Sequence, residues 1–157
     1  MSGWIAAVVA LLLHEAGHLT AAVCLGIPLR RLHLEPGGAA MTFDFSHAGY
    51  LAEAIVHGCG PLFGIAAAFS FCRMSPYLSG LSLTLSLVNL LPIRGLDGGG
   101  LLTSLLSLRF LPDTVWRITE AASGAALLCL WGAVLWIELR VGPDLALLAF
   151  VLALFFR

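Results

Sequence analysis

Residues 4–25 form an apolar run that is long enough to cross a lipid bilayer, and this run carries His14, Glu15 and His18 near its middle. About 20 apolar residues in a row are typical of a transmembrane helix. Ionisable side chains at bilayer depth are costly and normally face a protein interior or a water-filled site. We therefore predict a membrane-spanning helix that turns one polar face inward, toward a functional site.

The composition places the rest of the chain in a membrane as well. Hydrophobic residues make up 60% of the chain and charged residues 11%, with a mean hydropathy of +0.99, whereas a soluble domain carries about 25% charged residues. The formal net charge is −1, and the basic residues are arginines scattered along the sequence. We therefore expect the lipid bilayer as a partner of this chain, and no nucleic acid.

The hydrophobic pattern predicts about five transmembrane helices and one β-hairpin. Apolar and polar residues alternate on both sides of Pro36-Gly37-Gly38, which is typical of a hairpin. A short apolar helix is expected from Asp97 to Phe110. The predicted spans are residues 4–25, 50–71, 76–93, 112–138 and 141–156, of which the last is short for a bilayer. The fold class is thus an all-α integral membrane protein, a polytopic helical bundle with a membrane-associated β-hairpin after the first span.

The arginines predict the orientation of the spans. With five spans, most arginines gather on one side of the membrane, and the positive-inside rule makes that side cytoplasmic. The N-terminus is then outside and the C-terminus inside the cell. The arginines predicted on the cytoplasmic side are Arg30, Arg31, Arg94, Arg109, Arg117 and Arg157, whereas Arg73 and Arg140 lie opposite.

The sequence His14-Glu15-Ala16-Gly17-His18 has the spacing of a zinc hydrolase. His14 and His18 are four residues apart and share one face of a helix, so both can direct a ring nitrogen to one ion. Glu15 lies about 100° around the helix from His14 and can act on water without ligating the ion. We expect one zinc ion per chain, with Glu15 within reach of the water bound to that ion.

A catalytic zinc ion needs a third protein ligand. Asp97 is favoured, because Pro92 breaks a helix just before it and the glycines after it allow close backbone approach. Asp97 could equally cap the following helix, and spacing alone leaves both roles open. The other candidates are Asp44, Glu53, His33, His47 and His57.

Together these motifs resemble those of the site-2 protease family of intramembrane zinc metalloproteases, in particular its small bacterial branch that processes a membrane-tethered pro-sigma factor in sporulation. The HEAGH sequence at 14–18 is similar to the family's HExGH pattern, and Gly60-Pro61-Leu62 to its GPL element. Asn89, Pro92 and the LDGG sequence at 96–99 resemble its N..P....LDGG motif. Phe63-Gly64 departs from the family, which commonly has an asparagine shortly after GPL.

The resemblance implies an enzyme, a zinc-dependent intramembrane endopeptidase in the bacterial cytoplasmic membrane. It implies that His14, His18 and Asp97 ligate zinc, that Glu15 is catalytic, and that Asn89 and Pro92 orient the substrate or the site. The expected partners are a transmembrane or membrane-tethered substrate, of the pro-sigma-factor or anti-sigma-factor type, and a regulatory or inhibitory membrane protein. We divide the single domain, residues 1–157, into a catalytic core at about 4–110 and accessory spans at about 114–156.

The predicted hairpin offers a strand edge that can pair with an extended substrate, and its apolar residues Met41 and Phe43 are candidates for substrate contact. Glu53 and His57 are four residues apart, and His57 lies level with His18 on the predicted topology. They either support the site from behind its ligands, contact the substrate, or form an ordinary hydrogen bond or ion pair within their span. His33 and His47 are expected to be hydrated loop histidines.

Two other functions remain as alternatives. A non-catalytic homologue that binds and retains membrane partners would have no physical reason to keep both Glu15 and Asp97 in an apolar environment. A divalent-metal transporter would need polar residues along several spans, whereas those of this chain cluster at one depth.

Overall fold

The computed structural model describes residues 3–35, 38–142, 144–145, 148–149 and 151–152. The first four predicted spans, the hairpin and the short helix after Asp97 are present, whereas the turn residues 36–37 and half of the predicted fifth span, 141–156, lie outside the described residues. The elements are α1 (Gly3–Cys24), β1 (Leu29–Glu35), β2 (Gly38–Phe43), α2 (Tyr50–Phe71), α3 (Pro76–Asn89), α4 (Asp97–Ser107) and α5 (Pro112–Val141).

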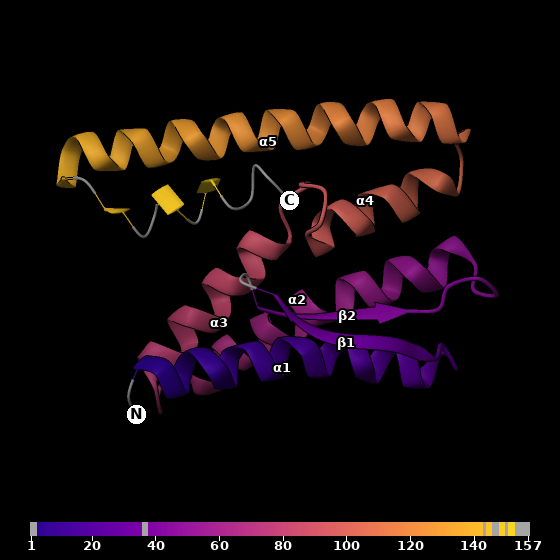
Figure 1. Ribbon diagram of the computed structural model, residues 1–157. Coiled ribbons are helices and arrows are strands. Elements are labelled where there is room, and N and C mark those ends of the chain that lie inside the picture. The colour runs from indigo at the N-terminus through magenta and orange to yellow at the C-terminus, as the bar shows by residue number, and fades with distance from the viewer. Residues whose placement is uncertain (1–2, 36–37, 143, 146–147, 150, 153–157) are drawn as a thin grey trace.

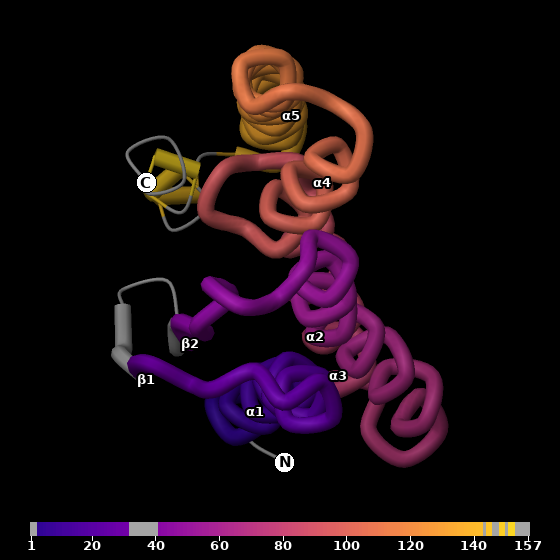
Figure 2. Tube along the Cα trace, turned by 90° about the vertical axis from the view of Figure 1, so that its right-hand side faces the viewer, coloured from indigo at the N-terminus to yellow at the C-terminus, as the bar shows by residue number. Residues whose placement is uncertain are grey.

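The helices form a bundle with α1 and α5 at opposite edges (Figures 1 and 2). Helix α2 packs against α1, α3 and α4, and so forms the centre of the bundle. Near its first residues α1 packs through Ala6 and Ala10 on Leu78 of α3. Toward its end it packs through Ala21 and Ala22 on α2. Small side chains on α1 let the neighbouring helices approach closely, as in other membrane bundles.

Large apolar side chains cover the outside of the molecule. Trp4, Leu12, Val23, Phe69 and Leu128 are each more than 60% exposed. A soluble protein rarely presents so much contiguous apolar surface. Among the helices that the structure describes, α1, α2 and α5 are long and apolar enough to cross a membrane. The prediction of a helical membrane protein is therefore confirmed.

The predicted third span was too long at its C-terminal end. Helix α3 ends at Asn89, four residues before the predicted end at Ile93. Pro92 has no N–H group to donate to the preceding turn, and its ring disfavours a helical conformation at Leu91. The segment 90–96 that follows is irregular and leads directly into α4. The third apolar segment is thus a helix of 14 residues, a break and a second helix.

Contacts with α5 hold this irregular segment. Ile93 and Leu96 are buried and pack against Ala126, Leu127 and Leu130 of α5. The backbone N–H of Arg94 donates to the Ser123 hydroxyl over 3.1 Å, and its guanidinium pairs with Glu120 at 2.7 Å. A non-helical backbone in a membrane protein needs such partners, because lipid offers none.

The β-hairpin is confirmed and lies beside α1 (Figure 2). The strands β1 and β2 pair antiparallel, with Leu29 opposite Phe43 and Leu32 opposite Met41. Phe43 and Phe45 pack on the apolar cluster formed by the ends of α1 and α2. This packing brings β2 next to the histidine-bearing part of α1.

Candidate metal centre

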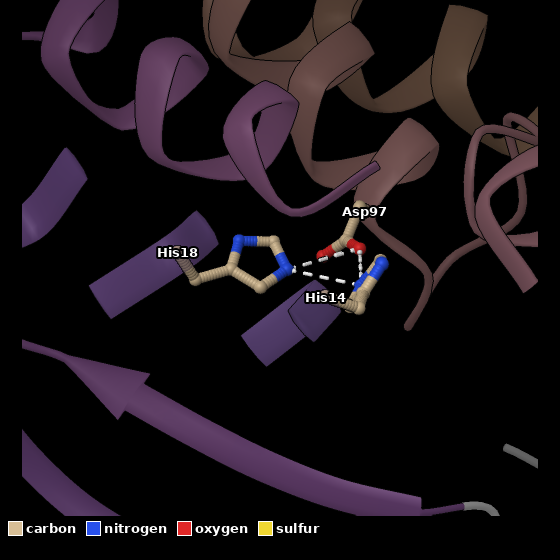
Figure 3. A group of neighbouring side chains, drawn as sticks. All are labelled: His14, His18 and Asp97. Carbon is tan, nitrogen blue, oxygen red and sulfur yellow. Dashed lines mark hydrogen bonds and ion pairs between the residues drawn. The ribbon is translucent and has the colours of Figure 1, made fainter. Parts of the chain in front are cut away.

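Three ligand atoms from distant parts of the chain converge inside the bundle (Figure 3). The Nε2 atom of His14 is 2.9 Å from Asp97 Oδ2 and 3.2 Å from His18 Nε2. The Nε2 atom of His18 is 3.2 Å from the same carboxylate oxygen. Both histidines are buried. The structure thus brings together the two histidines predicted from their spacing with the favoured third candidate.

The ring of His18 is held from behind by α2. Its Nδ1–H donates to the backbone carbonyl of Val56 over 2.8 Å, which leaves the Nε2 lone pair free to face a metal. Gly60, one turn further along α2, lies directly against this ring. A Cβ atom at Gly60 would meet His18 Nε2, so the ring fits only where α2 carries glycine.

Asp97 is the first residue of α4, and it does not cap that helix. Leu96 occupies the N-cap position and no side chain makes a capping hydrogen bond there. The carboxylate is instead turned toward α1, where it meets His14 and His18. The break at 90–96 makes this approach possible, because it starts α4 at the level of the two histidines. The capping role left open by the sequence is therefore not the one observed.

A cavity of about 400 Å³ opens beside the three ligand atoms, and residues of α1, β2, α2, α3 and α4 line it. Glu15 also lines the cavity. It is not one of the three residues whose side chains lie close enough together to hold a metal ion. The volume is sufficient for a short extended peptide segment and water. The lining residues are Leu11, His14, Glu15, His18, Met41, Thr42, Phe43, Phe45, Val56, His57, Leu85, Asn89, Gly95, Leu96, Asp97 and Gly100.

Most of the other predicted site residues reach this cavity. Met41 and Phe43 enter it from β2, and Asn89 enters it from the end of α3, where its amide donates to the Leu85 carbonyl over 3.1 Å. His57 enters it from α2. Pro92 and Glu53 do not line it. Within the described part of the chain, no hydrogen bond or ion pair joins Glu53 to His57, so the ordinary pair considered from the sequence is absent.

The remaining candidates for the third ligand are occupied or lie elsewhere. Asp44 accepts hydrogen bonds from the Ser46 hydroxyl and backbone N–H and pairs with Arg30 at 2.8 Å. These contacts lower the pKa of the Asp44 carboxyl to about 2. Asp44 therefore fastens the end of the hairpin. His47 is exposed in the loop before α2, and the side chain of His33 lies outside the described part of the structure.

The residues present fit a zinc ion. Two imidazole nitrogens and one carboxylate oxygen are a frequent protein donor set for catalytic zinc, and they leave a fourth position open. Bond lengths of about 2.0 Å in a tetrahedral site put ligand atoms roughly 3.3 Å apart. The three separations measured here, 2.9, 3.2 and 3.2 Å, are close to that value.

Sequence reasoning missed the residues that support the ligands. The carbonyl that orients His18 belongs to Val56, and a backbone group gives no signal in a sequence. Phe45, Leu85 and Leu11 line the cavity, but as apolar residues in apolar segments they could not be distinguished from lipid-facing ones. Gly60 was visible only through the GPL resemblance, which did not reveal its contact with His18.

Comparison with solved structures gives an independent view of this arrangement. The structure is similar to that of the Site-2 Protease from Methanocaldococcus jannaschii, with a TM-score of 0.72 and 24% sequence identity. The similarity covers 97% of this chain and 73% of that chain. No family model and no curated protein sequence matches the chain. The chain therefore has the fold of a site-2 protease, and the resemblance found in its motifs is supported by its three-dimensional structure.

Proposed function

We propose that this protein is a zinc-dependent intramembrane endopeptidase. Its substrate is a transmembrane or membrane-tethered protein cut near the cytoplasmic face, and a pro-sigma factor or anti-sigma factor fits that class. One observation carries the proposal: His14, His18 and Asp97 converge beside a cavity that Glu15 also lines. Ionisable groups inside apolar helices are costly, and a catalytic site accounts for all four at once.

In the proposed reaction, His14, His18 and Asp97 hold one zinc ion per chain. Bound zinc supplies Lewis-acid chemistry, in that it acidifies water and polarises the scissile carbonyl. Glu15 takes the proton of the attacking water and returns it to the leaving amide nitrogen. The hydrogen bond from His18 to the Val56 carbonyl keeps the ring of His18 in one tautomer and orientation throughout.

We assign substrate binding to the hairpin and to the end of α3. A transmembrane substrate hides its peptide bonds in helical hydrogen bonds and has to unwind locally before it can be cut. Strand β2 lines the cavity through Met41, Thr42 and Phe43. An extended substrate that pairs with β2 would recover the backbone hydrogen bonds lost on unwinding. Asn89 and Pro92 are then the residues that orient the substrate or the site.

The proposed location is the bacterial cytoplasmic membrane, with the N-terminus outside, the C-terminus inside and about five spans. The proposed single domain comprises a catalytic core at about 4–110 and accessory spans at about 114–156. A regulatory or inhibitory membrane protein is the second expected partner, besides the substrate and the lipid bilayer. A non-catalytic homologue that retains membrane partners is the alternative function.

Replacing Glu15 with Gln tests the proposal, because this change keeps the shape of the side chain and all three ligands but removes the base. Comparison of membrane proteomes from cells with and without an active copy would supply the substrate. We expect the E15Q variant to retain about one zinc per chain and to cleave that substrate at least ~10²-fold more slowly. Unchanged cleavage by E15Q would refute the protease mechanism and favour the non-catalytic alternative.

A further inference from the structure

We propose that His57 is a positioning residue for Asp97. In this arrangement His57 holds one oxygen of the Asp97 carboxylate and thereby directs the other oxygen to the metal. The inference rests on the proposed function and adds to it a residue that acts through a metal ligand instead of ligating the metal itself.

The two oxygens of Asp97 face different partners. Oδ2 is the atom that meets His14 at 2.9 Å and His18 at 3.2 Å. Oδ1 faces the other way, toward α2, where His57 Nδ1 lies 3.8 Å from it. Within the described residues, Asp97 is the one polar side chain that lies within ion-pair distance of the His57 ring. In the proposed arrangement each oxygen therefore has a separate function: Oδ2 ligates the metal, and His57 holds Oδ1.

The separation of 3.8 Å is longer than a direct hydrogen bond. A bridging water can close it, because the His57 side chain is 27% exposed and lines the cavity. A small rotation of the ring can close it as well, and contacts of this kind commonly tighten only when the site is loaded. Either way, a donor on His57 restrains rotation of the carboxylate.

The fold keeps the His57 ring against the helix that carries Asp97. Gly100 follows Asp97 by three residues on α4, and a Cβ atom there would lie 2.6 to 2.7 Å from three atoms of the His57 ring. Real Cβ atoms do not approach other atoms so closely, so the ring occupies the space left by the missing side chain. The Phe45 ring lies near His57 as well, with 6.0 Å between ring centroids. The ring is thus confined between α4 and the hairpin.

A ligand role for His57 is less well supported than a positioning role. Its ring nitrogens do not belong to the group of atoms that lie within 4.8 Å of one another. A fourth protein ligand would also close the position that a catalytic zinc keeps open. Residues that hold a zinc ligand from behind typically contribute 10- to 100-fold to metal affinity or activity.

The test measures zinc affinity of the full-length protein in detergent by competition with a chelator. The visible spectrum of the cobalt(II)-loaded protein reports the geometry of the ligands in the same samples. We expect about 10- to 100-fold weaker zinc binding for His57→Ala, with a changed cobalt spectrum. His57→Asn should recover part of the affinity, because its amide nitrogen takes nearly the place of Nδ1.

A second variant moves the ring without altering its chemistry. Gly100→Ala should displace His57 and weaken zinc binding, whereas Gly58→Ala is the matched control. A Cβ atom at Gly58 meets only Leu101, at an ordinary 4.0 Å. Thermal unfolding of each variant, followed by circular dichroism, verifies that the helices remain folded.

Unchanged zinc affinity in both His57→Ala and Gly100→Ala would overturn the positioning role while leaving the proposed protease intact. Equal loss in His57→Asn and His57→Ala would overturn it as well, because a metal ligand gives that result. Wild-type protein that binds no zinc would instead refute the proposed function itself.

Discussion

Replacing Gly60 with Ala should disable the site through a single added carbon atom. The new Cβ would overlap the ring of His18, and even His18 Cδ2, the most distant of the three ring atoms affected, would lie 2.6 Å away. Ordinary contact begins at 3.4 Å, so the ring has to retreat by about 0.8 Å or more. A misplacement of about 1 Å typically costs on the order of 10²-fold in rate.

The effect on folding should be much smaller than the effect on activity. Ala in place of Gly inside a helix is favourable by roughly 0.5–1 kcal/mol, which partly offsets the strain of moving one side chain. We therefore expect Gly60→Ala to insert and fold, to bind zinc more weakly and to cleave its substrate about 10²-fold more slowly. The same assays on Gly58→Ala, two residues away on α2, provide the control. Activity of Gly60→Ala within twofold of that control would refute the argument that His18 needs this space.

Three further perturbations address other parts of the structure. Asp97→Ala removes one of three ligands, so metal analysis of the purified variant should find less than the one zinc per chain expected of the wild type. Proline placed in turn at positions 41–44 should impair cleavage at alternate positions with normal zinc content, because proline removes one strand donor; a uniform loss would mean that the hairpin unfolds. Ser123→Ala leaves the Arg94 N–H without its acceptor and should lower the free energy of unfolding in detergent by about 1 to 3 kcal/mol, whereas Ser107→Ala, which removes only an exposed hydrogen bond within α4, should not.

Local patterns predicted the parts of the molecule that depend on local physics. The spacing of His14 and His18 fixes a shared helix face wherever the helix lies. Alternating polar and apolar residues around 36–38 sufficed for the hairpin, since strand pairing over a short turn needs no distant partner. The position of Pro92 indicated a break in the helix. The predicted end of α3, Ile93, was nevertheless four residues too late, because the helix ends at Asn89.

Contacts between distant elements could not be predicted in the same way. The approach of His57 to Asp97 joins residues 40 positions apart in sequence and depends on how α2 packs against α4. The contact between Gly60 and His18 likewise exists only once α1 and α2 are side by side. Packing of this kind is set by the shapes of whole helix faces, and single-residue patterns carry little of that information.

The ion pair between Arg94 and Glu120 links the site to the thickness of the surrounding bilayer. Both side chains are more than half exposed, as expected of charges at a headgroup region. Residues 121–137 of α5 carry no charge and span about 26 Å, compared with about 30 Å of hydrocarbon in a typical bilayer. A thicker bilayer has to thin around α5 or draw this pair inward. Since Arg94 lies three residues before Asp97, we expect the acyl-chain length of the lipids to influence the rate of cleavage, with shorter chains favouring it.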